Sequence, residues 1–446
     1  MHFWAYVIFA FIIGSCVGSF LNVVVWRLPR VEVPAGTGLW RSILLTLEHL
    51  SNPPSHCPNC KQHIRWYDNI PVIGWIKLGG KCRFCKQPIS IRYPIVEAIT
   101  GGLFAFYFVM FFRVMPPCAA WGPAMEVDAW GSLRAVAPVP GHLLNWPEDR
   151  GIYAVYMTLV AALLAASLID AESFIIPIEI PWVLAIVGVV FHAIADEPRK
   201  SWALSASPAT GAIAAGAGVG LAISILAWLR SWIPQSFPDG EPLLEVDRAA
   251  IAAEMEEAKR VGKTLEYEGQ LPPVYSRAQV RAEIGKEMLF LLPPMVLGAV
   301  WMLVCLHVTA VNGMWMRVMA HAWVSGLLGA VLGALVGGFV VWLTRILGTL
   351  GFGRVAMGMG DVHLMFGVGA IIGGGATTVA FFLAPFFGIL VAIYMMISRT
   401  RRELPYGPYL SLAVCFVLLC YCPIYWWLAP GVAGLASIVR QMVGGA

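Results

Sequence analysis

Long apolar runs separated by short polar segments dominate the sequence of this 446-residue chain. About 20 apolar residues in a helix span the hydrocarbon core of a bilayer, so most of these runs are long enough to cross a membrane. The predicted spans cover residues 3–26, 93–112, 151–169, 180–195, 209–232, 288–308, 320–347, 362–378, a further stretch that ends at 397, and 410–428. The pattern therefore predicts an all-α polytopic membrane protein with about 8–10 transmembrane helices, with glycines 373–375 interrupting one of them.

Composition and charge support this class. Hydrophobic residues make up 59% of the chain and charged residues 13%, and the mean hydropathy of +0.74 exceeds what a soluble core needs. The net charge of +4 is too small to indicate binding to nucleic acid, so we expect no such partner. Basic residues between 27 and 92, and again near 399–402, instead place those segments in the cytoplasm under the positive-inside rule.

The polar segments divide the chain into five predicted parts. These are a first transmembrane helix (1–26), a small cytoplasmic domain (27–92), helices that carry Asp170 (93–196), an insertion with two extra spans (197–319) and C-terminal helices that carry Asp361 (320–446). The insertion contains a predicted cytoplasmic segment, 235–287, with 11 of the chain's 26 acidic residues. Within that segment, residues 247–260 predict a short amphipathic helix. We expect the insertion to be a docking or regulatory element outside the active site.

Four cysteines in the predicted cytoplasmic domain have the spacing of metal ligands. Two Cys-x-x-Cys pairs, Cys57 with Cys60 and Cys82 with Cys85, are separated by 21 residues. Each pair can supply two thiolates from one turn, so the pattern predicts a structural Zn²⁺ site that stabilises a domain too small for its own core. The alternative is a pair of disulfides, which a reducing cytoplasm disfavours.

Two aspartates at the ends of apolar runs are the candidate catalytic residues. Asp361 completes the turn Gly358-Met359-Gly360-Asp361, and Asp170 follows the run 151–169. Two nearby carboxylates do not both ionise easily, so one can act as the acid while the other activates a water. We expect Gly358 and Gly360 to provide positive φ or close approach to the acid. The alternative is that each aspartate merely caps the helix that follows.

These residues resemble the signature of type IV prepilin peptidases, which are membrane aspartic proteases of the Gly-x-Gly-Asp type. The resemblance rests on Asp170, Pro177 seven residues later, and the turn 358–361. Further motifs occur in the family's order, namely Gly14-Ser15-x-x-Gly18-Ser19-Phe20-Leu21-Asn22, Arg27-Leu28-Pro29, the four cysteines, Ile91-Arg92-Tyr93-Pro94-x-x-Glu97 and Tyr406-Gly407-Pro408-Tyr409. The resemblance covers roughly residues 1–196 and 320–428 and leaves the insertion unexplained.

The resemblance implies a function and a location. Such enzymes cleave the short basic leader from type IV pilin and pseudopilin precursors, which serve type IV pili and type II secretion, at the cytoplasmic face of the bacterial inner membrane. Asp170 and Asp361 would be the catalytic pair. Relatives with the four-cysteine domain often also methylate the new N-terminus with S-adenosylmethionine, for which Gly80, Arg92 and Glu97 are candidate residues. Turn formation and helix anchoring are alternative roles for these three.

Three other classes share some of these features. A presenilin-like intramembrane protease would have the Gly-x-Gly-Asp turn but would not need the cysteine pairs. A proton-coupled transporter could use two membrane aspartates as a relay, although its expected inverted repeats are not evident in the sequence. A membrane-assembly protein could use the cysteine domain for docking and the aspartates as helix caps.

Overall fold

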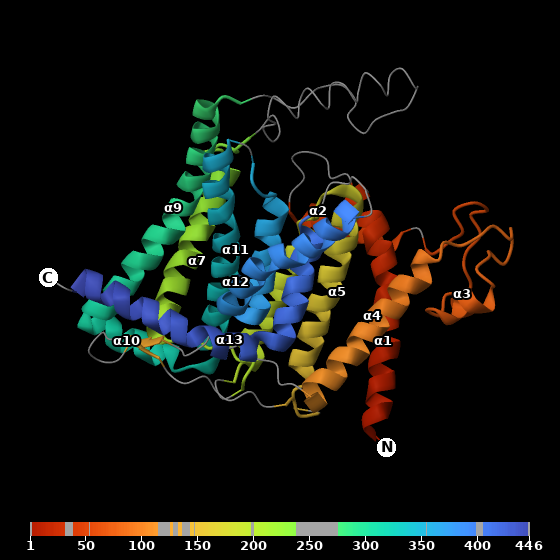
Figure 1. Cartoon of the computed structure of the whole chain (residues 1–446), viewed down its shortest axis with the longest axis horizontal. Helices are drawn as coiled ribbons and strands as arrows, with labels where there is room; N and C mark the ends of the chain where they lie inside the picture. Colours follow the sequence, from red (N-terminus) through yellow and green to blue (C-terminus); the bar gives the residue numbers. More distant parts are fainter. Residues whose placement is uncertain are drawn as a thin grey trace.

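The chain forms a bundle of long helices in a computed structural model (Figure 1). The structure describes residues 2–31, 39–52, 54–114, 125–127, 133–135, 143–146, 148–197, 200–237, 275–353, 355–397 and 405–444. The predicted all-α class is confirmed, with one small addition that the apolar pattern did not predict. This is an antiparallel hairpin of the strands β1 (Met125–Val127) and β2 (Leu133–Ala135).

Seven helices in the described part of the chain are long and apolar enough to cross a membrane. They are α1 (His2–Arg27), α4 (Arg92–Val109, which continues as the π-helical turn η3, Met110–Val114), α5 (Arg150–Ser173), α7 (Pro208–Leu229), α9 (Arg277–His307), α11 (Ala322–Phe352) and α12 (Met359–Ile397). Shorter apolar helices are α6 (Glu179–Ala195) and the first part of α13 (Gly407–Gly444). With these two, the apolar helices of the described residues fall within the predicted range.

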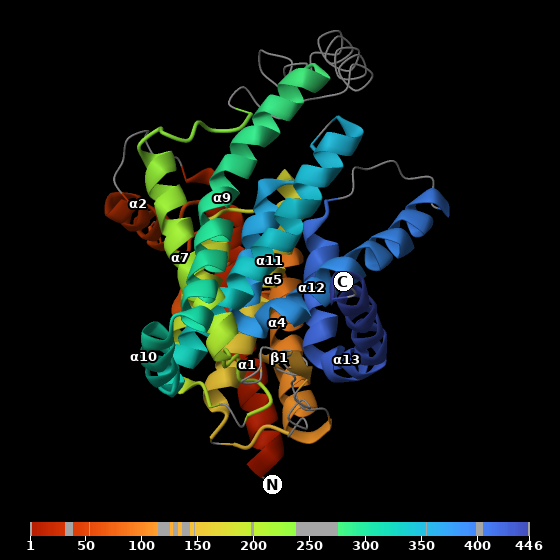
Figure 2. The ribbon, with the colours of Figure 1, turned by 90° about the vertical axis from the view of Figure 1, so that its left-hand side faces the viewer.

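Several short helices connect the long ones. The segment between α1 and α4 contains η1 (Leu28–Arg30), α2 (Leu39–Ser51), η2 (Trp66–Asp68) and α3 (Ile73–Lys77), and α10 (Thr309–Met319) joins α9 to α11. The α1 N-terminus and α10 lie at one end of the bundle, while α2 and the start of α9 lie at the other (Figures 1 and 2). The insertion helices α7 and α9 form one side of the bundle, away from α1 and α4 (Figure 1).

The helix predicted to begin at 288, after the polar segment 235–287, begins earlier in the structure. Helix α9 begins at Arg277, eleven residues before the predicted span at 288, because Ser276 and Gln279 form a reciprocal capping box there. The polar residues after Arg277 are therefore the first turns of a continuous long helix. The amphipathic helix predicted at 247–260 lies outside the described residues.

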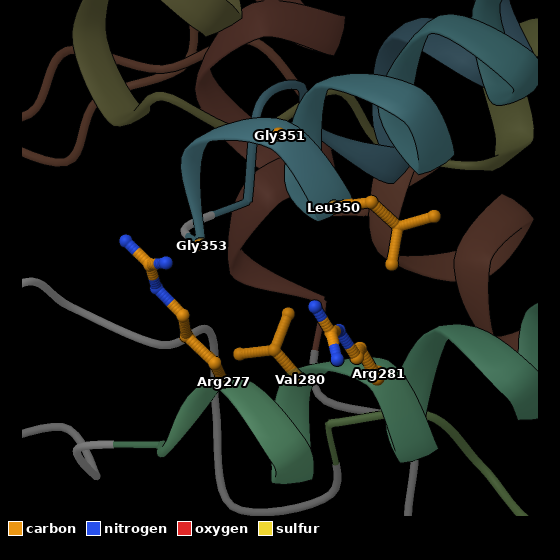
Figure 3. A pocket seen from close by; sticks show the side chains of 6 residues that line it. All are labelled: Arg277, Val280, Arg281, Leu350, Gly351 and Gly353. Carbon is orange, nitrogen blue, oxygen red and sulfur yellow. The ribbon is translucent and has the colours of Figure 1, made fainter.

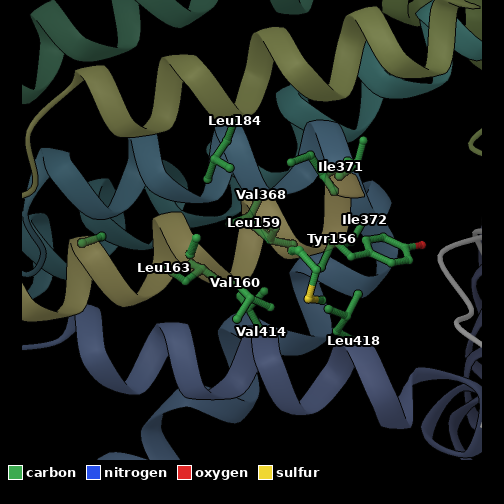
Figure 4. Packing of buried hydrophobic residues seen from close by; sticks show 14 of the residues in the cluster. Tyr156, Leu159, Val160, Leu163, Leu184, Val368, Ile371, Ile372, Val414 and Leu418 are labelled. Carbon is green, nitrogen blue, oxygen red and sulfur yellow. The ribbon is translucent and has the colours of Figure 1, made fainter. Parts of the chain in front are cut away.

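Helix α5 occupies the centre of the main hydrophobic core. Its fully buried side chains contact α6, α12 and α13 (Figure 4). The core residues shown there include Tyr156, Leu159, Val160, Leu163, Leu184, Val368, Ile371, Ile372, Val414 and Leu418. Lipid is as apolar as these side chains, so close van der Waals packing holds such helices together. The core thereby fixes the ends of α5 and α12, which carry the two aspartates.

Glycines allow a very close contact between α11 and α12. A Cβ on Gly333 would lie 2.1 Å from the carbonyl oxygen of Gly369, and a Cβ on Gly369 would lie 2.1 Å from that of Gly333. Since Cβ atoms essentially never approach backbone so closely, both positions require glycine. The small residues allow the two backbones to pack directly against each other.

Helix α12 bends back on itself at Gly373, as the predicted interruption at 373–375 indicated. Gly373 has φ 79° and ψ 159°, far from helical values. Gly337 of α11 faces both Met365 and Thr377, which are twelve residues apart in α12 on either side of the bend. A straight helix would separate them by about 18 Å. The second arm of α12 therefore returns toward the end of the bundle at which Asp361 lies.

The insertion helices α7 and α9 pack against each other at the two prolines of α9. Pro294 in α9 has no N–H to donate to the carbonyl of Phe290, one turn earlier. The hydroxyl of Ser224 in α7 donates to that carbonyl instead, at 2.7 Å. A Cβ on Gly220 would lie 2.4 Å from the carbonyl oxygen of Pro293, so glycine lets α7 approach this point. In lipid such a freed carbonyl needs an internal donor, and Ser224 provides it.

Candidate functional site

Asp170 lies in the last turn of α5 and is 6% exposed. Its Oδ2 accepts a hydrogen bond of 2.9 Å from the backbone N–H of Gly407, at the start of α13. A Cβ on Gly407 would lie only 2.6 Å from the same oxygen. The bare backbone of Gly407 is therefore what allows a peptide N–H to reach this carboxylate.

Asp361 lies in the first turn of α12 and is 7% exposed. The turn before it packs on the segment that links α5 to α6, where a Cβ on Gly360 would lie 3.0 Å from Cβ of Ile176. The expected positive φ is wrong for both glycines, since neither Gly358 nor Gly360 is among the described glycines with positive φ. Close approach is the alternative reason for glycine, and at Gly360 the contact with Ile176 provides it.

Tyr406 and Gly407 connect the two aspartates. Gly407 donates to Asp170, while its neighbour Tyr406 lies close enough to Asp361 to be influenced by its charge. Burial raises the pKa of the Tyr406 phenol, and the negative charge of Asp361 adds to this increase. The adjacent residues Tyr406 and Gly407, at the start of α13, thus lie near one aspartate each, which places both carboxylates at the same end of the bundle.

The alternative that the aspartates merely cap helices fits only one of the two. Asp170 caps no helix, because it belongs to α5 and the residue before α6 is Ile178. Asp361 remains compatible with a favourable interaction with the N-terminus of α12, where an acidic residue suits the helix dipole. Pro177 lies between the two helices, and its carbonyl accepts the N–H of Ile180 at 3.2 Å, so it ends the link just before α6.

A contact that the sequence pattern did not predict fixes the turn before Asp361. Arg345 of α11 is 3% exposed and donates through Nη1 to the carbonyl of Met357. One turn further along α11, the hydroxyl of Thr349 accepts the N–H of Ala356 at 3.2 Å. The available signal was an arginine inside the apolar run 320–347, since a charge in a membrane span usually has a specific partner.

The four predicted metal ligands form a cluster that could hold a metal ion. The Sγ atoms of Cys57, Cys60, Cys82 and Cys85 lie within 4.8 Å of one another, and all four thiols are free. The distance from Cys57 to Cys85 is 3.7 Å and that from Cys60 to Cys82 is 3.9 Å. The alternative of two disulfides does not fit, because an S–S bond is about 2.05 Å long.

Backbone N–H groups favour the thiolate at the first cysteine of each pair, Cys57 and Cys82. Those of Cys85 and Phe84 lower the pKa of the Cys82 thiol to about 6. The N–H of Cys60 lowers the pKa of Cys57 in the same way. Because metals bind the deprotonated thiol, these hydrogen bonds prepare the site for a cation.

The two halves of the cluster repeat one structure, a pattern that the sequence analysis also missed. Both read Cys-x-x-Cys-Lys-Gln, and Lys61 and Lys86 have φ of 59° and 60°. In each half the first cysteine donates its N–H to the carbonyl of the glutamine, at 3.0 Å for Cys57 and 2.8 Å for Cys82. The repeated Lys-Gln was the signal in the sequence for this pair of matching turns.

The three candidate methyltransferase residues occupy structural positions. Gly80 has φ 68° and packs on the ring of Trp75, where a Cβ would lie 2.8 Å away. Glu97 is buried in α4 and its Oε2 accepts the N–H of Val72 at 2.7 Å, which ties the cysteine domain to α4. These contacts support the alternative roles in turn formation and helix anchoring.

Arg92 lies close to the end of the bundle that carries Asp170 and Asp361. It begins α4 and forms an ion pair with Glu172, two residues after Asp170. Both side chains are more than a third exposed, so the pair contributes little to stability. Its value is positional, because it shows that the cysteine domain joins the bundle at the end where Asp170 lies.

A shallow pocket also lies between the N-terminus of α9 and the C-terminus of α11 (Figure 3). Its lining consists of Arg277, Val280, Arg281, Leu350, Gly351 and Gly353. It contains neither of the aspartates nor any of the four cysteines, so it is separate from the candidate site.

The N-terminal part of the chain is similar to known proteins. Residues 12–111 match the family described as Bacterial Peptidase A24 N-terminal domain. The chain is 44% identical over 99 residues to a prepilin leader peptidase/N-methyltransferase from Myxococcus xanthus (strain DK1622), which is 22% of this chain and 25% of that protein. It is 32% identical over 188 residues to one from Pectobacterium carotovorum subsp. carotovorum, 41% of this chain and 54% of that protein.

The matched regions are partial. A type 4 prepilin-like proteins leader peptide-processing enzyme from Escherichia coli O78:H11 is 42% identical over 121 residues, which is 26% of this chain and 43% of that protein. The chain thus spans between a quarter and about half the length of these curated relatives. No solved structure matches the chain. The expected resemblance to prepilin peptidases is confirmed over the matched regions.

Proposed function

We propose that this chain is a membrane aspartic endopeptidase that removes the short basic leader from type IV prepilin or pseudopilin precursors. The observation that carries the proposal is the position of two buried carboxylates at one end of the bundle. Asp170 and Asp361 come from different helices, and the consecutive residues Gly407 and Tyr406 face one each. The names of the relatives in the matched regions support the substrate class.

The chemistry follows from two carboxyl groups of low exposure. One aspartate in its ionised form takes a proton from a water, which attacks the scissile carbonyl. The other, protonated at the start, donates its proton as the peptide C–N bond breaks. The two groups titrate as a pair, so the starting proton belongs to the dyad as a whole. The N–H of Gly407 donates to Oδ2 of Asp170 and so holds this carboxyl group in one orientation.

We place the dyad at the cytoplasmic face of the bacterial inner membrane. The cysteine domain carries many basic residues, and the positive-inside rule puts such a segment in the cytoplasm. The ion pair between Arg92 and Glu172 joins the base of this domain to the end of α5 that carries Asp170. A precursor whose basic leader stays in the cytoplasm would present its cleavage point at that level.

We assign the four-cysteine cluster to a structural Zn²⁺. Four sulfurs about 2.3 Å from a tetrahedral zinc would lie about 3.8 Å apart. The two Sγ pairs of the cluster lie 3.7 and 3.9 Å apart. Bound zinc would supply a crosslink between the two Cys-x-x-Cys turns, and four thiolates leave it no open position for catalysis.

We extend the proposal to methylation of the new N-terminus with S-adenosylmethionine. The relatives named prepilin leader peptidase/N-methyltransferase support this second activity. Gly80, Arg92 and Glu97 lie on or beside the cysteine domain, and their structural contacts would make them supports for a methyl-transfer site.

Cleavage of a pilin-like precursor tests the proposal. The wild type, Asp170→Asn and Asp361→Asn are each co-expressed with a precursor that has a basic leader and an apolar helix, and mass spectrometry reads the mature N-terminus. Loss of cleavage in both single variants, with unchanged insertion into the membrane, is the expected result. Asp149→Asn is the matched control, because Asp149 is equally buried but lies at the opposite end of α5.

Three results would each count against a part of the proposal. Normal cleavage by either dyad variant would exclude the two-aspartate mechanism and revive the transporter alternative. Cleavage within the apolar helix of the substrate instead of at the leader would favour the presenilin-like alternative. A wild-type product without the added mass of one methyl group would remove the methyltransferase part alone.

A further inference from the structure

A buried ion pair joins the insertion to the helix before the Gly-x-Gly-Asp turn. Glu287 of α9 and Arg345 of α11 are each 3% exposed, and Arg345 Nε lies 3.3 Å from Glu287 Oε1. The indole N–H of Trp342 donates to Oε2 of Glu287 at 2.7 Å. The hydroxyl of Ser236 donates to Oε1 at 3.3 Å. With three donors around it, the Glu287 carboxylate is held in one orientation.

Arg345 extends this network to the catalytic turn. Its Nη1 donates to the carbonyl of Met357, the residue directly before Gly358-Met359-Gly360-Asp361. The hydroxyl of Thr349, on the same face of α11, accepts the N–H of Ala356. The N–H of Ala356 and the carbonyl of Met357, five and four residues before Asp361, are thus both hydrogen-bonded to α11.

Stability alone does not explain this pair. Removing two charges from water costs several kcal/mol per ion, and apolar replacements of a buried pair are often neutral or stabilising. The contact between α9 and α11 already has an apolar part, formed by Val280 and Ile284 of α9 with Ile346 of α11. What an apolar replacement could not supply is the donor to the Met357 carbonyl.

The network begins in the part of the chain that the resemblance to prepilin peptidases leaves unexplained. Helix α9 belongs to the insertion, and the residues that lead into 238–274 attach to it. Beside the bond from Ser236 to Glu287, the N–H of Phe237 donates to Oε2 of Glu283 at 2.8 Å. The start of the insertion's polar segment is therefore hydrogen-bonded directly to Glu287, through Ser236.

We propose that Arg345 is a positioning residue for Asp361 and that Glu287 of the insertion holds Arg345 in place. The insertion then acts as a built-in part of the active site: a change at Ser236 or Glu287 moves the peptide before the Gly-x-Gly-Asp turn. This inference rests on the proposed function for its effect on catalysis, and its structural part stands on the contacts alone.

The first test uses a double variant that keeps the packing and removes the donor. Glu287→Met combined with Arg345→Met replaces the ion pair by side chains of similar volume. We expect the thermal midpoint to stay within a few degrees of the wild type, since the buried charges are removed together. We expect kcat for precursor cleavage to fall about 10- to 100-fold, because Asp361 shifts relative to Asp170. KM should be unchanged, because neither substituted side chain is proposed to bind the substrate.

Single variants separate positioning from packing. Glu287→Gln keeps the shape of the side chain and loses its charge, so it should lower kcat in the same direction. Glu283→Gln is the matched control, one turn earlier on α9. It loses the ion pair with Lys286 but keeps an oxygen that can accept the N–H of Phe237, so it should cleave like the wild type. A charge-swapped variant, Glu287→Arg with Arg345→Glu, should fold but stay slow, because a carboxylate at 345 cannot donate to Met357.

Hydrogen exchange gives a readout that does not need a substrate. The amides of residues 355–361 should exchange faster in the double methionine variant than in the wild type, and at the wild-type rate in Glu283→Gln. Wild-type exchange and wild-type kcat in the double variant would overturn the proposal. Failure of the wild type to cleave any precursor would defeat the proposed function, while the exchange result would still decide whether Arg345 positions the turn.

Discussion

The backbone N–H of Gly407 donates to Oδ2 of Asp170 across 237 positions of sequence, at 2.9 Å. This contact ties the end of α5 to the start of α13, and it gives the carboxylate a fixed donor inside a region of low exposure. Charged hydrogen bonds of this kind are about twice as strong as neutral ones. The contact therefore fixes the direction in which the Asp170 carboxyl group points.

The first prediction concerns Gly407→Ala. Its new Cβ would lie 2.6 Å from Oδ2 of Asp170, so the carboxylate or the start of α13 must shift. A displacement near 1 Å at a catalytic group can cost about 100-fold in rate, so we expect a loss of kcat of that order. The measurement is precursor cleavage by the variant in membranes.

Gly388→Ala is the control for this variant. Its Cβ would meet the ring of Tyr409 at 3.6 Å, which is an ordinary van der Waals distance. It adds the same methyl group to a neighbouring part of the bundle, so it should keep activity near that of the wild type. Equal activity of the two variants would show that the bond from Gly407 to Asp170 has no catalytic role.

The apolar pattern and the cysteine spacing predicted much of the fold. Length and composition alone identified the long helices, because a bilayer imposes a minimum number of apolar residues. The three glycines at 373–375 indicated the bend in α12, and the structure places it at Gly373. The four cysteines form the expected cluster because a Cys-x-x-Cys turn brings its two sulfurs together locally.

The remaining features depend on contacts between distant residues. The bond from Gly407 to Asp170 and that from Arg345 to Met357 join helices whose neighbours no periodicity specifies. The sequence alone also does not show why residue 360 is glycine, because a positive φ and a close contact both select this residue. Helix α10 was missed because it is short and follows α9 without a clear polar break.

The second prediction concerns metal content. The purified protein should contain one Zn²⁺ per chain, and Cys57→Ser or Cys82→Ser should lose it, because each removes one of four ligands. Cys305→Ser is the matched control, since Cys305 is equally buried but lies in α9 far from the cluster. Elemental analysis checks the ratio. A wild-type protein that folds and binds no zinc in the presence of excess metal would contradict the assignment.

The third prediction concerns His192, which supports the bend in α12. Its Nε2 contacts the carbonyl of Ile371 at 3.3 Å, two residues before Gly373, and its Nδ1 contacts Oδ1 of Asp196 at 2.8 Å. His192→Ala leaves a buried carbonyl without this donor and removes one partner of a buried pair. We therefore expect a loss of about 2–4 kcal/mol of stability, read as a lower thermal midpoint in detergent.

Exposed His307 in α9 provides the control for His192. His307→Ala should unfold at the wild-type temperature, because its side chain lies on the surface of the chain. If His192→Ala also unfolded at that temperature, the contact with Ile371 would not be what stabilises the bend.

The fourth prediction concerns the pH dependence of the cysteine domain. Arg83 donates to both carboxylate oxygens of Asp68, at 2.6 and 2.5 Å, and this bond lowers the pKa of Asp68. A depressed pKa means that the ion pair contributes its full stability above the unfolded-state pKa of about 3.9. That contribution is lost as the pH falls through the lower pKa of the folded state. Between pH 5 and 7 it should be constant.

Comparing the wild type with Asp68→Asn separates the effect of this ion pair from the loss of any bound metal in acid. Both proteins keep the four cysteines, so both should lose the metal in the same way. At pH 6, residues 57–89 should be cleaved by protease, or exchange their amide hydrogens, more slowly in the wild type than in the variant. The difference should shrink as the pH is lowered below about 4, because Asp68 then becomes protonated in the wild type. A difference that persisted unchanged to the lowest pH would mean that the shape of the Asp68 side chain, and not its charge, supports the domain.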